Sequence, residues 1–521
     1  MAENYYWFYF TDKENNGYSI DQPEEFLSQR SIDRRAWQSL PVTQSDLPLT
    51  SVYTDSLETL GLTVTYSSKW LNGVLIFGTD QALIDTLHHI SFIDTLAWEA
   101  DRYEYYYPGS PQAERFGEKY TNPPSYQYGL STEQIRQLKL DELHAFGYTG
   151  KGVMIAVLDA GFTGLPQLPS FTTAMENNQI LDSRNFVDPG EDIFTGHSHG
   201  MSVSSIIIAN WPDTLIGAAP DATLLLAKTE NPQSETRLEE YSWIEAAEWA
   251  DSLGADILNT SLGYTTFDDS TTNYSYMDLD GRNAHISVAN GMTAEKGMIS
   301  VTSAGNSGNS NWFYIGAPAD AFDILSVGAV DSTGILAPFS SRGPSYDLRI
   351  KPEVSAMGAL TAVQSTDGSA RRGNGTSYSS PMIAGAAAAL WQAYPAVTAK
   401  ELMRWIIESG SRNYNPDAEY GFGIPSFRGA YYAITGVDRR SITNEIHLYP
   451  NPFTSYINLD IPVDFQGTYS LRILDLQGRV VLREELSLPG RFDLTMHMPT
   501  GLYLIELENR DHIFRSRIIK N

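Results

Sequence analysis

Apolar residues in the middle of the chain gather in short runs, with stretches of helical spacing between them. Runs rich in apolar residues at 153–158, 223–228, 257–263, 298–304 and 324–330 predict buried strands. Between two of these runs, Leu238–Leu253 places Trp243, Ala246 and Ala250 on one side of a helix, and a further helix is expected at 286–296. Strands that alternate with helices predict an α/β domain over residues 129–437, built on a doubly wound parallel sheet.

The first part of the chain, residues 1–107, alternates short strands with short helices. The aromatic run Tyr5–Phe10 predicts a strand, because aromatic side chains favour extended structure. Further strands are expected at 63–66, 73–78 and 93–98, and helices at 24–40, 57–60 and 80–90. This order predicts a small α+β domain. Residues 108–128 are rich in proline, glycine and tyrosine and predict a linker.

The last part of the chain, residues 444–521, contains no long helical pattern. Short apolar segments separated by turn signals predict strands at 444–449, 456–461, 468–475, 480–486, 492–495, 501–508 and 513–519. So many short strands in fewer than eighty residues are typical of a β-sandwich. The charged segment Val437–Thr443 before them predicts a linker, so these strands are expected to form a separate all-β domain.

Composition narrows the classes of protein that the chain can belong to. A length of 521 residues predicts two to four domains. The net charge of −28 argues against binding to nucleic acid or to anionic membranes. The absence of cysteine excludes disulfides, thiolate metal sites and a cysteine nucleophile. No segment predicts a transmembrane helix, because the longest apolar stretch ends near Pro395, short of the roughly 20 residues that a span needs.

The stretch Gly375–Pro381 carries the first candidate for chemistry. It leads into the small and apolar run Met382–Leu390, which predicts a buried helix whose first turn contains Pro381. Ser377 then lies at the start of that helix, where free backbone N–H groups and the helix dipole favour negative charge. A serine nucleophile needs this setting because an oxyanion develops beside it, although a serine there could also serve only as an N-cap.

Three further candidates follow predicted strands or begin a helix. Asp159 comes directly after the strand at 153–158, His199 precedes a glycine and an apolar helix, and Asn306 lies in a glycine-rich turn after the strand at 298–304. Each has an ordinary reading as a turn or capping residue. His197 is a rival to His199, but only His199 directly precedes the glycine. The carboxyl ends of parallel strands meet at one edge of a sheet, which is where sites of α/β proteins gather.

Together, these residues are those that nucleophilic acyl transfer requires. His199 is expected to take the proton of Ser377 and to return it to the leaving amine. Asp159 is expected to fix the imidazole tautomer, and Asn306 to donate its side-chain N–H to the oxyanion beside the backbone N–H of Ser377. The order Asp, His, Ser along the chain and the asparagine donor are those of subtilisin, which serves as a standard example of this chemistry.

The chain resembles the subtilisin-like serine proteases (subtilases) across roughly residues 129–437. The resemblance lies in eight motifs in the family's order: Val157–Gly161, His199–Val203, Gly217–Pro220, Asn259–Gly263, Ser303–Gly308, Phe339–Pro344, Lys351–Glu353 and Gly375–Pro381. It implies that Ser261, Leu262, Gly263, Ala304 and Gly305 line the substrate channel, where a peptide pairs as an added strand. Ala160, Met201, Tyr378 and Ser379 depart from the usual motifs without removing a catalytic atom, so they bear on substrate preference.

The flanking domains carry resemblances of their own. The N-terminal block resembles a subtilase propeptide in size, position and element order, which implies an inhibitor and folding chaperone; an independent binding domain is the alternative. Tyr449–Pro452, Gly501–Tyr503 and Arg517–Lys520 resemble the C-terminal sorting domain of the type IX secretion system of Bacteroidetes. This implies a bacterial protein that is exported through the periplasm and then secreted or attached to the cell surface, its signal peptide having been removed.

The function predicted from these features is a secreted serine endopeptidase with protein or peptide substrates. The alternative is a catalytically silent surface binding protein on a subtilase scaffold, but no member of the triad is missing. No cofactor is expected to be required. Many subtilases bind calcium, and Asp278–Gly281 offers two carboxylates and a glycine, but Tyr276 and Ser287 stand where an EF-hand loop needs acidic residues. An ordinary turn is therefore expected there, and no metal ligand is assigned.

Overall fold

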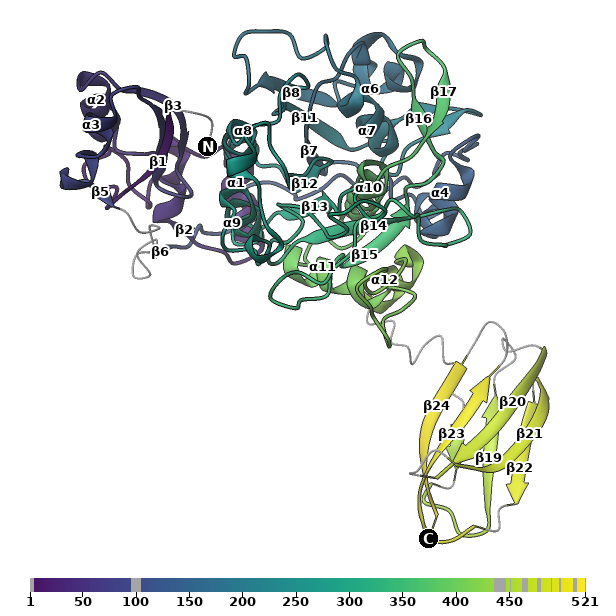
Figure 1. Ribbon diagram of the computed structural model, residues 1–521. Coiled ribbons are helices and arrows are strands. Elements are labelled where there is room, and N and C mark those ends of the chain that lie inside the picture. The colour runs from purple at the N-terminus through teal and green to yellow at the C-terminus, as the bar shows by residue number, and fades with distance from the viewer. Residues whose placement is uncertain are drawn as a thin grey trace. The chain divides into compact units, whose positions relative to one another are not determined.

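A computed structural model describes residues 4–94, 105–434, 447–449, 451–461, 467–475, 479–488, 490–495, 498–508 and 513–520. The chain divides into two compact units, Met1–Tyr431 and Tyr432–Asn521 (Figure 1). The first unit contains both the N-terminal block and the central domain. The second contains the C-terminal strands.

The central domain is built on a sheet of seven parallel strands. Their order is β15 (Val354–Met357), β14 (Leu325–Val330), β13 (Ile299–Ser303), β12 (Ile257–Thr260), β7 (Met154–Asp159), β11 (Thr223–Lys228) and β8 (Ile180–Asn185). The five predicted strands are all present, and the prediction of an α/β fold is confirmed. The strand predicted at 257–263 ends at Thr260, so the next three residues leave the sheet.

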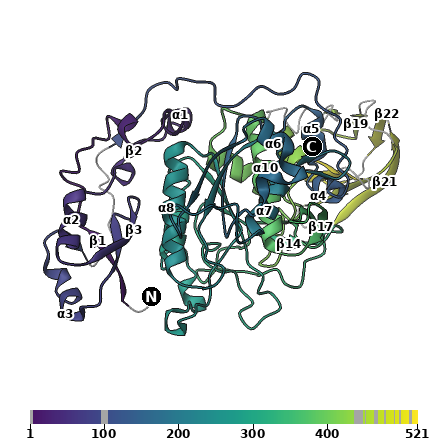
Figure 2. The same ribbon diagram turned by 90° about the horizontal axis from the view of Figure 1, so that it is seen from above.

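Helices cover both faces of this sheet (Figure 2). Helices α7 (His199–Ile208) and α10 (Thr376–Ala393) pack on one face, and α8 (Leu238–Leu253) and α9 (His285–Met292) lie on the other. The remaining helices of the central domain are α4 (Thr132–Gln137), α5 (Leu140–Ala145), α6 (Thr172–Glu176), α11 (Ala399–Glu408) and α12 (Phe427–Ile434). Helix α8 has the predicted bounds, whereas the helix predicted at 286–296 spans His285–Met292.

Helix α10 runs through the centre of the domain and is buried along almost its whole length. Small residues let it approach its neighbours closely: a Cβ at Gly385 would lie 2.6 Å from the Cβ of Ala218. The prediction that Pro381 lies in the first turn is wrong, because α10 already begins at Thr376. Pro381 has no N–H to donate to the carbonyl of Ser377 four residues earlier. That carbonyl accepts a hydrogen bond from the Ser261 hydroxyl instead (3.1 Å).

The N-terminal block is a four-stranded antiparallel sheet with short helices. The strand order is β3 (Thr63–Ser68), β4 (Gly73–Phe77), β1 (Tyr5–Phe10) and β5 (Ile93–Asp94). The helices are α1 (Gln29–Trp37), α2 (Ser51–Thr59) and α3 (Gln81–Ile84). Strand β2 (Val42–Thr43) pairs with β6 (Tyr105–Tyr106). The prediction of a helix over 80–90 is wrong beyond Ile84, and residues 95–98 of the strand predicted at 93–98 lie outside the described residues.

This block packs against α8 and α9 and shares a hydrophobic core with the central domain. The Trp7 ring stacks on Tyr241, with centroids 4.9 Å apart. The carboxylate of Glu248 in α8 accepts hydrogen bonds from the Ser68 hydroxyl (2.6 Å) and from the backbone N–H groups of Lys69 (3.1 Å) and Trp70 (3.0 Å). The N-terminal sheet is therefore tied to the helical face of the central domain by apolar and polar contacts alike.

The segment after the N-terminal block also packs on the central domain. The guanidinium of Arg115 is buried, donates to the carbonyls of Pro395 (2.7 Å) and Val397 (3.0 Å), and lies 4.4 Å from the ring centroid of Trp391. Phe116 beside it is also buried. The proline and glycine residues of the predicted linker at 108–128 therefore indicate irregular structure, but this segment still packs on the central domain.

The C-terminal unit consists of two antiparallel sheets. One sheet has the order β18 (His447–Tyr449), β19 (Tyr456–Ile461) and β22 (Gly490–Thr495); the other has the order β21 (Val480–Leu488), β20 (Gly467–Leu474), β23 (Gly501–Glu508) and β24 (Ile513–Lys520). All seven predicted strands are present, while residues 444–446 of the first and the predicted linker Val437–Thr443 lie outside the described residues. Tyr469, Leu471, Ile473 and Ile505 belong to a separate core cluster of this unit. Throughout the described parts of the chain, no helix combines the length and the apolar character needed to cross a membrane.

Candidate active site

The register of the central sheet brings the predicted site residues to one edge. Thr260 of β12 pairs with Leu158 of β7 on one side and with Thr302 of β13 on the other. Because the strands are parallel, the residues that follow these positions, Asp159 and Ser261 among them, emerge side by side. The site is thus assembled by strand pairing, from segments that are far apart in the sequence.

Asp159 and His199 are in direct contact at this edge. Asp159 ends β7 and is 1% exposed, and His199 is the first residue of α7. The His199 Nδ1 atom lies 2.8 Å from Oδ1 and 3.0 Å from Oδ2 of Asp159. A Cβ at Gly200 would lie 2.9 Å from the Cβ of Asp159, so the glycine after the histidine allows this approach. The Nε2 atom of His199 is left for another partner.

The electrostatics of the pair suit a base. Burial alone would lower the pKa of His199, but the Asp159 carboxylate stabilises the imidazolium, and the net effect raises the pKa above its usual 6.5. The positive charge of Arg371 acts in the opposite direction, as burial does. His197, the rival candidate, is exposed and accepts a backbone hydrogen bond from His199 (3.4 Å), and the structure shows no contact between it and Asp159.

Ser377 is the second residue of α10 and is 9% exposed. Its hydroxyl donates to the carbonyl of Ser261 (3.1 Å), and among the described residues it makes no hydrogen bond to His199. Tyr378 follows it and stacks on the His199 ring, with centroids 6.0 Å apart. Transfer of the Ser377 proton to His199 therefore requires the hydroxyl to turn away from Ser261. Hydrogen bonds of this kind are often formed only when substrate is bound.

Asn306 lies beside the start of α10 with its amide group oriented by Thr376. Its Oδ1 atom accepts hydrogen bonds from the backbone N–H (2.9 Å) and the hydroxyl (3.1 Å) of Thr376. The amide nitrogen is then free of that contact and lies 3.8 Å from where a Cβ of Gly375 would be. Gly305 before it has a φ of +104°, a left-handed value that favours glycine. The strand end therefore turns sharply and presents the Asn306 amide beside Ser377.

The predicted channel residues lie on two adjacent strand ends. Ser261, Leu262 and Gly263 follow β12, and Ala304 and Gly305 follow β13. The Ser303 hydroxyl donates to the Leu262 carbonyl (3.4 Å) and so links the two segments. The backbone of Gly263 runs close to that of Ala317, because a Cβ there would lie 3.3 Å from the Ala317 oxygen.

A cleft of about 500 Å³ opens beside the Asp159–His199 pair. Its lining residues are Asp159, Ala160, His197, His199, Glu230, Asn231, Pro232, Gln233, Ser234, Glu235, Ser261, Leu262 and Asp268. The acidic residues at 230, 235 and 268 were not predicted from the sequence. A signal was available, because Glu230 and its neighbours follow the strand Thr223–Lys228, which ends at the same sheet edge as β7.

The segment Asp278–Gly281 has the geometry of a turn. The Asp278 carboxylate accepts from the backbone N–H (2.7 Å) and hydroxyl (2.8 Å) of Ser275, and Asp280 accepts from the N–H of Arg282 (2.8 Å). The one group of acidic residues in the described parts of the chain whose oxygens lie close enough to share a metal ion is Glu230, Glu235 and Glu239. That no cofactor is required stays a prediction, and no calcium ligand is assigned.

The fold is that of an α/β protein with a parallel sheet between two layers of helices, and one edge of this sheet carries the contact between Asp159 and His199. Comparison with known families gives the family within this class of α/β proteins: residues 150–423 match the subtilase family, and the chain belongs to it. Residues 5–113 match the peptidase S8 propeptide domain of Bacteroidota, and residues 447–521 match a secretion system C-terminal sorting domain. The protein is a subtilisin-like peptidase with a propeptide domain, and its sorting domain marks it for secretion or export to the cell surface.

Two Bacillus subtilisins support the same family. Subtilisin E of Bacillus subtilis is 32% identical over 314 residues, which cover 59% of this chain and 71% of that protein. The subtilisin of Bacillus pumilus is 31% identical over 314 residues, covering 59% of this chain and 98% of that protein. A solved structure of MycP1 from the ESX-1 type VII secretion system is 22% identical, with a TM-score of 0.46, and covers 61% of this chain and 90% of that one.

Proposed function

We propose that this protein hydrolyses peptide bonds through an acyl-enzyme on Ser377. The contact between His199 Nδ1 and the buried Asp159 carboxylate carries the proposal, because it fixes the tautomer that leaves Nε2 as the proton acceptor. His199 takes the Ser377 proton as the hydroxyl attacks the scissile carbonyl, and then gives this proton to the leaving amine. Water attacks the acyl-enzyme in a second cycle of the same proton transfers.

The oxyanion of each tetrahedral intermediate is held by the Asn306 amide and the Ser377 backbone N–H. Two observations support this part of the proposal. The Asn306 oxygen is engaged by Thr376, which leaves its amide N–H groups to face the reacting centre. Ser377 also lies within the first turn of α10, whose first four N–H groups have no partner within the helix.

Substrate peptides are proposed to pair with Ser261–Gly263 and with Ala304–Gly305. These segments leave adjacent strands next to the catalytic groups, which allows main-chain pairing on both sides of a peptide. The catalytically silent alternative has no supporting feature, because the sequence retains the proposed acid, base and nucleophile.

Hydrolysis of a chromogenic peptide ester tests the acyl-enzyme step. We expect a burst of alcohol release equal to the concentration of active sites, followed by slower turnover, because acylation precedes deacylation. Ser377→Ala should show neither phase. Turnover retained by Ser377→Ala would contradict a covalent intermediate on this residue.

The sorting domain is proposed to use a type IX secretion system after the chain has reached the periplasm. Its match to a secretion sorting family and the Bacteroidota propeptide match support this route. Residues 444–521 fused to a reporter with a signal peptide should reach the medium or the cell surface of a Bacteroidota host with a working type IX system. A reporter that stays in the periplasm would contradict the proposal.

A further inference from the structure

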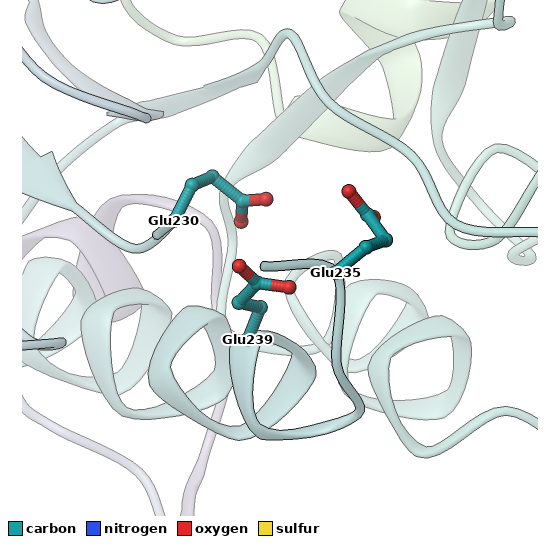
Figure 3. Close-up of side chains that lie close together, drawn as sticks. All are labelled: Glu230, Glu235 and Glu239. Carbon is teal, nitrogen blue, oxygen red and sulfur yellow. The ribbon is translucent and has the colours of Figure 1, made fainter. Parts of the chain in front are cut away.

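Three glutamates project into one space next to the catalytic pair. Glu230 follows β11, Glu235 lies in the connecting loop, and Glu239 lies in the first turn of α8. Each offers a carboxylate oxygen, and these oxygens lie within 4.8 Å of one another. Figure 3 shows the three carboxyl groups converging from a strand end, a loop and a helix.

Their hydrogen bonds leave several of the carboxyl oxygens without a donor. Both oxygens of Glu239 are occupied, by the backbone N–H groups of Asn231 (3.0 Å) and Thr236 (2.9 Å). One oxygen of Glu230 accepts from the Tyr264 hydroxyl. Within the described residues, the other oxygen of Glu230 and both oxygens of Glu235 have no hydrogen-bond donor, and none of the three glutamates has an ion-pair partner.

Nearby cationic side chains are engaged elsewhere. Arg237 lies two residues before Glu239, but it pairs with Glu240 (3.8 Å), donates to the Thr272 carbonyl and stacks on Tyr274, 3.8 Å from its ring centroid. Burial raises the pKa of Glu230 well above its usual range, that of Glu235 above its usual range and that of Glu239 to about 7, so the group keeps protons that a bound cation would displace. The carboxylates therefore crowd together without a cation from the chain to compensate them.

A second, independent observation indicates which ligand meets these carboxylates. The cleft of about 500 Å³ is lined by Glu230, Glu235 and Asp268 on one side and by Asp159, His199, Ser261 and Leu262 on the other. A peptide placed on Ser261–Leu262 with its scissile bond near His199 therefore extends side chains toward the acidic side. A side chain that enters this space would therefore come from the substrate.

We propose that the cleft selects peptides that carry an arginine or lysine side chain close to the scissile bond, and that Glu230 and Glu235 are the residues that hold it. This inference rests on the proposed peptidase function. A guanidinium or ammonium group would donate to the free Glu230 oxygen and to Glu235, with Asp268 adding negative charge at the rim.

A substrate side chain fits this site better than a calcium ion does. Calcium takes six to eight oxygen ligands at roughly 2.3–2.6 Å. Here the Glu239 oxygens already accept backbone N–H groups, and one Glu230 oxygen accepts a hydroxyl. The free oxygens are too few for that coordination shell, but they suffice for the donors of one guanidinium.

The test compares paired peptides cleaved by enzyme from the full-length chain. Each pair differs at one position within four residues of the scissile bond, with arginine in one member and the isosteric but neutral citrulline in the other. At one position, we expect kcat/KM for arginine to exceed that for citrulline by roughly 10- to 100-fold, as for a charge-assisted hydrogen bond. Glu235→Gln and Glu230→Gln should each reduce this ratio toward one. The ratio does not depend on how much of a variant folds.

Asp269→Asn is the matched control. Like the two glutamine variants it removes one carboxylate, but the Asp269 side chain, next to Asp268 in the sequence, does not line the cleft. It should keep the ratio of the wild type. A ratio near one at every position, or a high ratio that both glutamine variants retain, would overturn the inference. A calcium site would also overturn the inference. In that case, calorimetry with CaCl₂ alone would show binding to the wild type and no binding to Glu235→Gln, and the arginine-to-citrulline ratio would be near one.

Labelling of the same preparations with a fluorophosphonate distinguishes failure of the proposed preference for basic residues from failure of the proposed peptidase function. Enzyme that is labelled and cleaves both members of each pair equally well contradicts the preference for basic residues and leaves the peptidase function standing. Enzyme that is neither labelled nor able to cleave either peptide contradicts the proposed function, and the inference falls with it.

Discussion

At the scale of single residues, the account depends on three side chains that act as one unit. Replacing Ser377, His199 or Asp159 by alanine should each reduce kcat by several orders of magnitude, because each change breaks the same proton-transfer chain. Double replacements should not multiply the loss. His197→Ala is the control, since that ring is exposed and has no contact with Asp159. Steady-state kinetics measures kcat of each variant, and circular dichroism checks that each variant is folded. If His197→Ala lowered kcat as much as His199→Ala, the assignment of His199 as the base would be wrong.

Asn306 is expected to act on the transition state alone. Asn306→Ala should reduce kcat by roughly 10²–10³ with little change in KM, because its hydrogen bond forms fully only with the oxyanion. The same change also removes the acceptor of Thr376, so thermal unfolding of the variant should be measured alongside its kinetics. An unchanged kcat would remove Asn306 from the oxyanion hole.

The pH dependence of kcat/KM should report the ionisation of His199. Protonated His199 cannot accept the Ser377 proton, so activity is lost as the pH falls through its pKa, which Asp159 raises above the usual 6.5. The acid limb of the profile should therefore have its midpoint above pH 6.5. Asp159→Asn should lower the midpoint, and Arg371→Gln should raise it, because Arg371 opposes the charge on His199. A midpoint that Asp159→Asn leaves in place would contradict this coupling.

Sequence motifs identified the residues of the candidate site, but they did not predict which contacts these residues make. Asp159 and His199 could be placed because each stands next to a recognisable strand or helix signal. The position of the Ser377 hydroxyl on the Ser261 carbonyl could not, because it depends on how β12 meets α10. Glu230 and Glu235 were missed although they follow a predicted strand, because the sequence does not show which residues of a loop line the cleft.

At the scale of elements, the interface between the N-terminal block and α8 is the feature with a functional consequence. Residues 1–107, added separately to the processed enzyme, should inhibit it, because the block binds α8 through Glu248 and the stacked Trp7–Tyr241 pair. Glu248→Ala in the enzyme leaves the N–H groups of Lys69 and Trp70 without acceptors. It should weaken inhibition by roughly 10- to 100-fold.

Inhibition constants measured with a peptide substrate check this prediction. Glu176→Ala is the control, since this exposed acid of α6 lies away from the contacts described for the N-terminal block. Absence of inhibition at micromolar concentrations would favour an independent binding domain. Equal inhibition of the wild type and Glu248→Ala would place the binding energy elsewhere in the interface.

The elements themselves were predicted to different degrees. The five strands predicted for the central sheet were placed within one or two residues, except that the strand from Ile257 ends earlier, because their apolar runs have few alternative interpretations. The two outer strands, β8 and β15, were not predicted. The helix predicted over 80–90 was wrong beyond Ile84, where a short 3-10 turn, Leu87–His89, replaces it. The early start of α10 was missed as well, because a proline normally signals the first turn, and here the Ser261 hydroxyl satisfies the carbonyl that Pro381 leaves free.

At the scale of the whole molecule, the C-terminal unit has its own core, and the residues assigned to the candidate site all belong to the first unit, Met1–Tyr431. A chain ending near residue 437 should therefore fold and cleave peptides at close to the full-length rate. Peptidase assays and thermal unfolding of the truncated chain measure this. Loss of activity would mean that the sandwich supports the catalytic domain rather than serving only export.

The number of strands in this unit could be predicted, but not their pairing. Alternation of apolar and polar residues marks each strand locally. The order β21-β20-β23-β24 in one sheet and β18-β19-β22 in the other depends on contacts between strands far apart in the sequence, for which a single sequence holds no local signal.

If Ser377 is an activated nucleophile, a serine-reactive probe should modify it covalently. The full-length protein and its Ser377→Ala variant are treated with a fluorophosphonate, and the site of the adduct is mapped by mass spectrometry. The account predicts a stoichiometric adduct on Ser377, slowed strongly by His199→Ala and absent from Ser377→Ala. A folded wild-type protein without any adduct, or an adduct on another serine that Ser377→Ala retains, would contradict it.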